Sequence, residues 1–90
     1  MYAYLVEFIA SIFFVYVILA TGNPLAIGAA LALIIILLKD ISYGFANPAV
    51  TITMAAAGKI APSDVIPFCV VQVFGALVAL EIYKRYNMSN

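Results

Sequence analysis

The stretch SYGFANPAVTITMAAAG, residues Ser42–Gly58, decides how this chain folds. It contains an Asn-Pro pair followed by a run of helix-favouring residues that ends in three consecutive alanines and a glycine. Asn47 is a strong helix N-cap, Pro48 suits the first helical position, and Gly58 is a typical C-terminal stop. The pattern predicts a helix over about 47–58, roughly 16 Å long. That length is about half of the hydrocarbon thickness of a bilayer.

The rest of the chain has the composition of a membrane protein. Its 90 residues are 68% hydrophobic and 9% charged, and the mean hydropathy is +1.21. Soluble domains are roughly half apolar and a quarter charged, so lipid is the solvent that suits this chain. Four Lys and Arg balance four Asp and Glu, which excludes the basic surface of a nucleic-acid-binding protein. With no His and one Cys, we expect no zinc site, disulfide framework or cofactor.

Three segments are long enough to cross a bilayer, at about 20 residues for each span. We expect spans over about 4–21, 25–41 and 64–83, within one membrane unit of residues 1–90. The expected fold class is therefore an all-α, multi-pass integral membrane protein, in a membrane that the sequence does not identify. A glycosylation sequon at residues 87–89 lies too close to the last span to be given weight.

The short helix has two interpretations when its residues are considered alone. Its length suits an amphipathic helix lying in a surface loop. A surface helix should however carry a charged face, and residues 47–57 contain no charge. Non-helical backbone, such as residues 43–46, is tolerated at membrane depth only where protein buries it or water reaches it. The alternative is therefore a re-entrant half-helix, which implies a cavity.

Several motifs resemble the aquaporin and glycerol-channel family, the major intrinsic proteins, in the form of its first repeat. Asn47-Pro48-Ala49-Val50-Thr51 is similar to the family's Asn-Pro-Ala signature. Glu7-Phe8 resembles a pair in the family's first helix, and Ile41-Ser42-Tyr43-Gly44 resembles the approach to the signature. Gln72-Val73-Phe74-Gly75 resembles a motif in the third helix. The motifs occur in the family's order over nearly the whole chain, which resembles one half of an aquaporin-like fold.

The resemblance implies a pore built from two inverted repeats, each with three spanning helices and one half-helix. The half-helix N-termini meet at the midplane, where their partial positive charges oppose protons and cations. By the resemblance, Asn47 donates amide hydrogens to the permeating molecule, while Pro48 and Ala49 hold the two helix ends together. Glu7 and Gln72 are implied to hold the loop before the half-helix. From the residues alone, Asn47 is only an N-cap and Glu7 a carboxylate near the start of a span.

The resemblance also implies a selectivity filter. Ile27 stands at the position of an aromatic residue of water-selective members, and Val50 at the position of an arginine. Asp40 and Phe45 stand where family members often carry histidines. A filter of Ile27 and Val50 is apolar, so we expect weak discrimination between water and small neutral solutes such as glycerol. The alternative is a dewetted hydrophobic barrier at the same two residues.

The expected function is a passive channel whose pore forms when two half-repeats associate in opposite orientations. One three-helix repeat cannot enclose a pore. Lys39 and Lys59 on one side balance Lys84 and Arg85 on the other, so the positive-inside rule sets little orientation. The expected partners are lipid, small neutral solutes and a second copy, with dimers clustering further as in the family's tetramers. The alternatives are a small structural or holin-like membrane protein, or a non-conducting half that needs a different partner half. No nucleophile-base pair or phosphate loop indicates an enzyme.

Overall fold

Apolar runs and their caps produce four α-helices and one 3-10 turn in the computed structural model, which describes residues 2–86. In chain order these are α1 (Tyr2–Thr21), α2 (Pro24–Leu38), α3 (Pro48–Ala56), the 3-10 turn η1 (Pro62–Asp64) and α4 (Val65–Tyr86). No strand occurs within these residues, and the expected all-α class is confirmed. The glycosylation sequon at residues 87–89 lies outside the described part of the chain.

Two Asn-Pro pairs define where α2 and α3 begin. Asn23 Oδ1 accepts hydrogen bonds of 2.9 and 3.1 Å from backbone N–H groups in the first turn of α2, where Pro24 is the first residue. Asn47 Oδ1 accepts one of 2.8 Å from the N–H of Ala49, and Pro48 is the first residue of α3. Each Asn occupies backbone donors that a helix start leaves unpaired. These two helix starts therefore follow from local sequence.

The second apolar segment forms a shorter helix than the sequence suggests. Helix α2 ends at Leu38, whereas the expected span continues to residue 41, and residues 39–44 form turns. The charged pair Lys39-Asp40 ends the apolar run at this point. With 15 residues, α2 is about 22 Å long, less than the hydrocarbon core of about 30 Å. By length and composition, the described residues contain two helices able to cross a membrane, Tyr2–Thr21 and Pro62–Tyr86.

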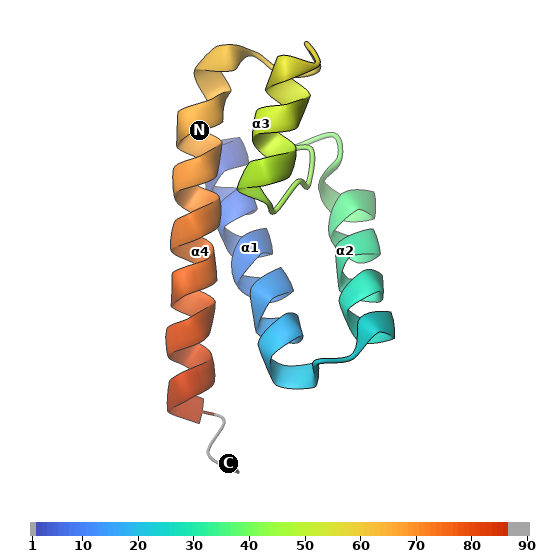
Figure 1. Cartoon of the computed structure of the whole chain (residues 1–90), viewed down its shortest axis with the longest axis vertical. Coiled ribbons are helices and arrows are strands. Elements are labelled where there is room, and N and C mark those ends of the chain that lie inside the picture. Colours follow the sequence, from blue (N-terminus) through green and yellow to red (C-terminus); the bar gives the residue numbers. More distant parts are fainter. Residues whose placement is uncertain (1, 87–90) are drawn as a thin grey trace.

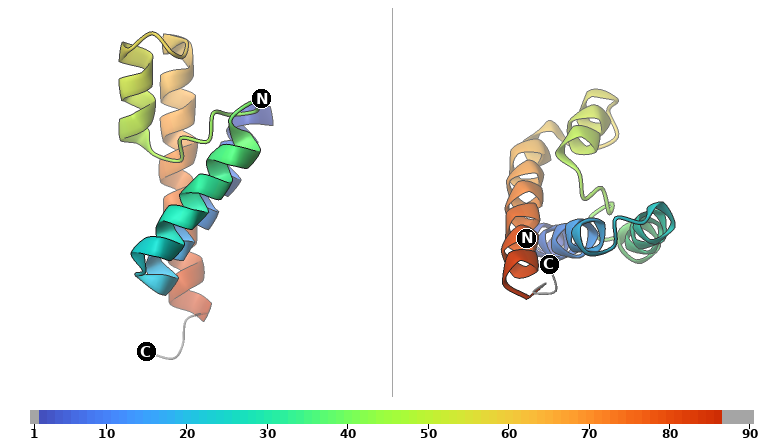
Figure 2. Two further views of the ribbon diagram at one scale, coloured as in Figure 1. Left: turned by 90° about the vertical axis from the view of Figure 1, so that its right-hand side faces the viewer. Right: turned by 60° about the horizontal axis from the view of Figure 1, so that its bottom comes forward.

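Helix α1 is the centre of the packing. It lies between α4 and α2, with α4 on one side and α2 on the other (Figure 1 and Figure 2). Helices α1 and α4 run in the same direction, and α2 returns in the opposite one. Helix α3 packs against the first half of α4 and begins near the middle of its length. The connection from α2 therefore has to return to about the middle of α4 before α3 can start.

Helices α1 and α4 approach each other closely at Gly75. A Cβ atom at this position would lie 2.7 Å from the carbonyl oxygen of Phe8 and 2.9 Å from Cβ of Ser11. Ala79, one turn further along α4, is completely buried. Small residues let helices approach closely in lipid, where association depends on packing rather than on the exclusion of water. Gly75 thus determines how near α4 can bring its other side chains to α1.

We predict that Gly75→Ala destabilises the fold by about 1–3 kcal/mol, because the added methyl group overpacks a backbone contact. Gly28→Ala is the matched control, since it is also a helical glycine and has no atom within 4 Å of the added Cβ. Unfolding in mixed micelles of rising SDS content, followed by circular dichroism, measures the difference. Equal midpoints for the two variants would contradict the close approach.

Candidate functional site

The loop before α3 has a backbone that few sequences adopt. Tyr43, Gly44 and Ala46 have φ angles of +71°, +72° and +52°, in the left-handed region. For Gly44 a side chain is also excluded by space, because a Cβ would lie 3.2 Å from the carbonyl oxygen of Ile34. For the two non-glycine residues this conformation costs about 1–2 kcal/mol each. The loop therefore depends on contacts from outside itself.

Glu7 of α1 supplies those contacts. Its carboxylate is fully buried, and Oε2 accepts a 2.8 Å hydrogen bond from the hydroxyl of Ser42. The other oxygen, Oε1, accepts from the backbone N–H of Ala46 and, at 3.0 Å, from Nε2 of Gln72. A buried carboxylate is costly unless such donors surround it. One side chain thus joins α1, the loop and α4.

Gln72 extends this network into α3. Its Oε1 lies 3.0 Å from the hydroxyl of Thr51, which also lies 3.1 Å from the carbonyl oxygen of Asn47. The single proton of Thr51 serves either acceptor. Glu7, Ser42, Thr51 and Gln72 are all at most 2% exposed. We name these four side chains the Glu7 network. Through it, α1 and α4 both hold the first turn of α3.

Asn47, in contrast, faces outward. Its side-chain oxygen is occupied by the N–H of Ala49, and this bond fixes the orientation of the amide group. Within residues 2–86 its Nδ2 group makes no hydrogen bond. Asn47 and Ala49 are exposed, whereas Pro48 and Val50 are half-buried. An oriented amide donor therefore stands free at the N-terminus of α3, where the helix dipole is positive.

A groove of about 270 Å³ lies beside this helix. Its lining side chains come from α2, the loop and α3, and they are Leu31, Ile35, Tyr43, Gly44, Phe45, Val50 and Met54. Val50 is therefore in the groove, and Ile27 is outside its lining. Ile27 is half-buried and lies one helical turn before Leu31, on the same face of α2. The structure does not bring Ile27 and Val50 together within one chain.

Sequence reasoning assigned no role to Ser42 and Thr51. Both are fully buried polar residues that belong to the Glu7 network. The available signal was their position in an apolar, uncharged segment, where a hydroxyl needs a partner. Their partners are 35 and 21 residues away in the chain, so the pairing itself was not visible. Within the described residues, no three His, Cys, Asp or Glu side chains form a group suited to a metal ion.

We predict that Glu7→Ala releases the loop before it unfolds the helices. Removing the carboxylate leaves three buried donors unpaired, a cost of about 3 kcal/mol. Glu81→Ala is the control, because the side chain of Glu81 is 65% exposed. Hydrogen–deuterium exchange in micelles should show faster exchange in residues 42–51 of Glu7→Ala, with the middle of α4 still protected. Unchanged exchange in residues 42–51 would show that Glu7 does not hold the loop.

Comparison with known proteins identifies the family. Residues 18–90 match the family model described as Major intrinsic protein. Glycerol uptake facilitator protein-like 6 of Lactiplantibacillus plantarum is 36% identical over 92% of this chain and 43% of its own length. Aquaporin Z of Bradyrhizobium diazoefficiens is 36% identical over 68% of this chain and 25% of its own length. Aquaporin-8 of Notomys alexis is 40% identical over 67% of this chain and 23% of its own length.

No solved structure gave a significant match. The chain spans less than half of the length of each of these relatives. The family match nevertheless covers most of the chain, and it includes the loop, α3 and α4. The family resemblance expected from the motifs is thus confirmed. This chain belongs to the major intrinsic protein family and is an integral membrane protein.

Proposed function

We propose that this repeat forms one half of a passive channel for water and small neutral solutes, and that an inverted second copy supplies the other half. The observation that carries the proposal is the free, oriented amide of Asn47 at the start of α3. The printed names of the relatives, a glycerol uptake facilitator and aquaporins, support the substrate class. A channel of this kind needs no catalytic group and no cofactor.

The chemistry of the α3 N-terminus suits neutral, hydrogen-bonding solutes. The 9 residues of α3 give a helix of about 14 Å, half of the bilayer core. Its N-terminal end carries about half a positive charge, which repels protons and cations in a narrow pore. A water molecule or a glycerol hydroxyl accepts a hydrogen bond from the Asn47 amide without net charge. In this proposal Pro48 and Ala49 form the contact between the two half-helices.

The groove beside α3 is proposed as one wall of the pore. Its side chains are largely apolar, and Val50 lies among them. Ile27 reaches the filter only in the assembled pore, where the partner's α3 approaches from the opposite side of the membrane. A filter with Ile27 and Val50 contains no fixed cation and few hydrogen-bond partners. We therefore propose weak discrimination between water and glycerol.

The inverted pair is supported by the arrangement of charge. Lys39 and Lys59 follow the ends of α2 and α3, and Lys84 and Arg85 lie in the last turn of α4. Helices α2 and α3 run in one direction and α4 in the opposite one (Figure 1). Two cations at each end give little preference for one orientation. The open side of the groove and the exposed Asn47 require a covering partner if a closed pore is to form. We propose that α2 also spans the membrane, in addition to α1 and α4, and that the turn after Leu38 completes its crossing.

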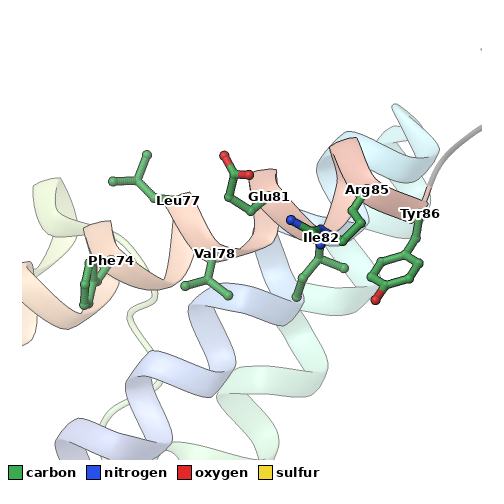
Figure 3. Close-up of a pocket in the computed structure, with 7 residues that line it drawn as sticks. All are labelled: Phe74, Leu77, Val78, Glu81, Ile82, Arg85 and Tyr86. Atoms are coloured by element: carbon green, nitrogen blue, oxygen red, sulfur yellow. The ribbon is translucent and has the colours of Figure 1, made fainter.

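The C-terminal half of α4 is proposed to face lipid. Its side chains line an open groove of about 430 Å³ that includes Phe74, Leu77 and Ile82 (Figure 3). Arg85 and Tyr86 lie at the end of this surface. A long basic side chain beside a tyrosine is typical of the boundary between lipid tails and water. Neither the groove nor the family membership favours a holin-like or purely structural role.

Osmotic shock of proteoliposomes tests conduction. We predict that wild-type vesicles shrink faster than empty ones, with a low activation energy, and that glycerol also enters. Asn47→Ala should lower water permeability about fivefold, since one hydrogen bond is worth about 1 kcal/mol. Asn23→Ala is the matched control, because it removes an equivalent N-cap from α2. Shrinkage rates equal to those of empty vesicles, with inserted and folded protein, would contradict the proposed channel. Water conduction with complete exclusion of glycerol would contradict the proposed weak discrimination.

Accessibility labelling tests the inverted pair. In a Cys69→Ser background, a cysteine introduced by Tyr86→Cys at the end of α4 should react with an impermeant maleimide from both sides of the membrane in similar amounts. The equal division follows from the balanced cations at the two ends. Labelling from one side only would exclude two copies in opposite orientations. The second half of the pore would then come from a different partner.

A further inference from the structure

A second cavity borders the loop before α3. Tyr43 of this loop lines both this cavity and the groove beside α3. The second cavity has a volume of about 250 Å³ and a largely polar wall. The start of α1, the turn after α2 and the start of α4 enclose it. The residues that the argument uses are Tyr4, Lys39, Asp40, Tyr43, Asp64 and Phe68. Charged residues on the turn after α2 place this cavity at the boundary between lipid and water.

Three aromatic rings pack together at one side of this cavity. The ring of Phe68 lies 5.1 Å from that of Tyr4, with 80° between the planes. It lies 6.1 Å from that of Tyr43, with 73° between the planes. Phe68 itself is 2% exposed and anchors the other two rings to α4. Rings that meet at such angles pack edge to face against one another, and the exposed faces of aromatic rings attract cations.

The charge at the cavity is net negative. Lys39 and Asp40 pair at 3.8 Å and offset each other, with side chains 62% and 89% exposed. Asp64 is half-buried, and its Oδ1 accepts a 2.7 Å hydrogen bond from the hydroxyl of Tyr4. Within residues 2–86, its second oxygen has no hydrogen-bond partner. The cavity therefore combines a positioned carboxylate that has a spare oxygen with the rings of Tyr4 and Tyr43.

We propose that this cavity binds an organic ammonium group, such as that of choline or ethanolamine. The carboxylate of Asp64 supplies the opposite charge, and the rings of Tyr4 and Tyr43, anchored by Phe68, supply the electron-rich surface that alkylammonium groups prefer. A bare metal ion is less suited, because the cavity offers only two carboxylates, and Asp40 is paired with Lys39. The ammonium group comes either from a lipid headgroup at the membrane surface or from a free cation in solution.

Tyr43 connects this cavity to the groove beside α3. The same residue lines both, and its ring stacks on that of Phe45 at 5.1 Å with 9° between the planes. Phe45 lines the groove as well. A ligand that holds Tyr43 therefore also holds Phe45 against the groove. This consequence rests on the proposed channel function, whereas the binding itself does not.

Binding is tested on the purified full chain in an uncharged maltoside detergent. With the tyrosine rings labelled with ¹³C, choline chloride should give saturable NMR shifts, while sodium chloride at equal ionic strength should not. Asp64→Asn should weaken choline binding about tenfold. Glu81→Gln, an exposed carboxylate at the far end of α4, should leave it unchanged. Equal shifts with sodium, or unchanged choline binding in Asp64→Asn, would overturn the proposal.

Phe68→Leu provides a second test if Asp64→Asn fails to fold by circular dichroism. It keeps Asp64 and removes the ring that anchors Tyr4 and Tyr43, so it should weaken choline binding severalfold. Native mass spectrometry identifies the source of the ligand. If the wild type retains phosphatidylethanolamine or phosphatidylcholine in preference to phosphatidylglycerol, and Asp64→Asn loses this preference, the ligand is a lipid headgroup. If choline binds without such lipid retention, the ligand is a free cation. Failure to bind either would overturn the ammonium site.

Proteoliposome permeability then tests the connection through Tyr43 separately. Adding choline should change water permeability about twofold in the wild type and leave Asp64→Asn unaffected. Choline binding without any change in permeability would reject the connection and leave the binding site in place. A chain that binds choline and conducts no water would reject the channel alone. The two proposals therefore fail in distinguishable ways.

Discussion

The buried carboxylate of Glu7 is the interaction on which the rest of the structure depends. It lies in a helix with no other charged residue, and it receives donors from Ser42, Ala46 and Gln72. Without these donors, a charge at this depth would be costly. Without the carboxylate, the loop with its left-handed residues loses the hydrogen bonds from Ser42 and Ala46 that tie it to α1. The two requirements satisfy each other, and together they hold the start of α3 near the middle of α4.

The two Asn-Pro pairs show how position changes the meaning of one local pattern. Asn23 and Asn47 both cap a helix through the side-chain oxygen, and each is followed by a proline. Asn23 is the second residue of the two-residue break between α1 and α2, at an end of the molecule. Asn47 caps a helix that packs against α4 and begins near the middle of its length, and its amide donor is free. The chemistry is the same at both sites, and only the surroundings make one of them a candidate for solute contact.

Much of the fold and part of the site were predictable from the residues. Apolar runs indicated the helices, and Asn47-Pro48 indicated where α3 starts. The expected second span continued to residue 41, past the charged pair Lys39-Asp40 that directly follows Leu38, where α2 ends. Ser42 and Thr51 were not assigned to the Glu7 network, because contacts between residues 35 or 21 positions apart leave no local pattern.

The sequence by itself determined the class of the protein, its helices and its family, since composition, caps and ordered motifs are local properties that a linear chain displays. Only the tertiary structure decided which polar groups are partners and where α3 lies relative to α4. It also decided that Tyr43 separates two cavities, which no pattern around that residue indicates. The physical reason is that burial and hydrogen-bond pairing depend on segments distant in the chain, and packing of α1 against α4 at Gly75 brings those segments together.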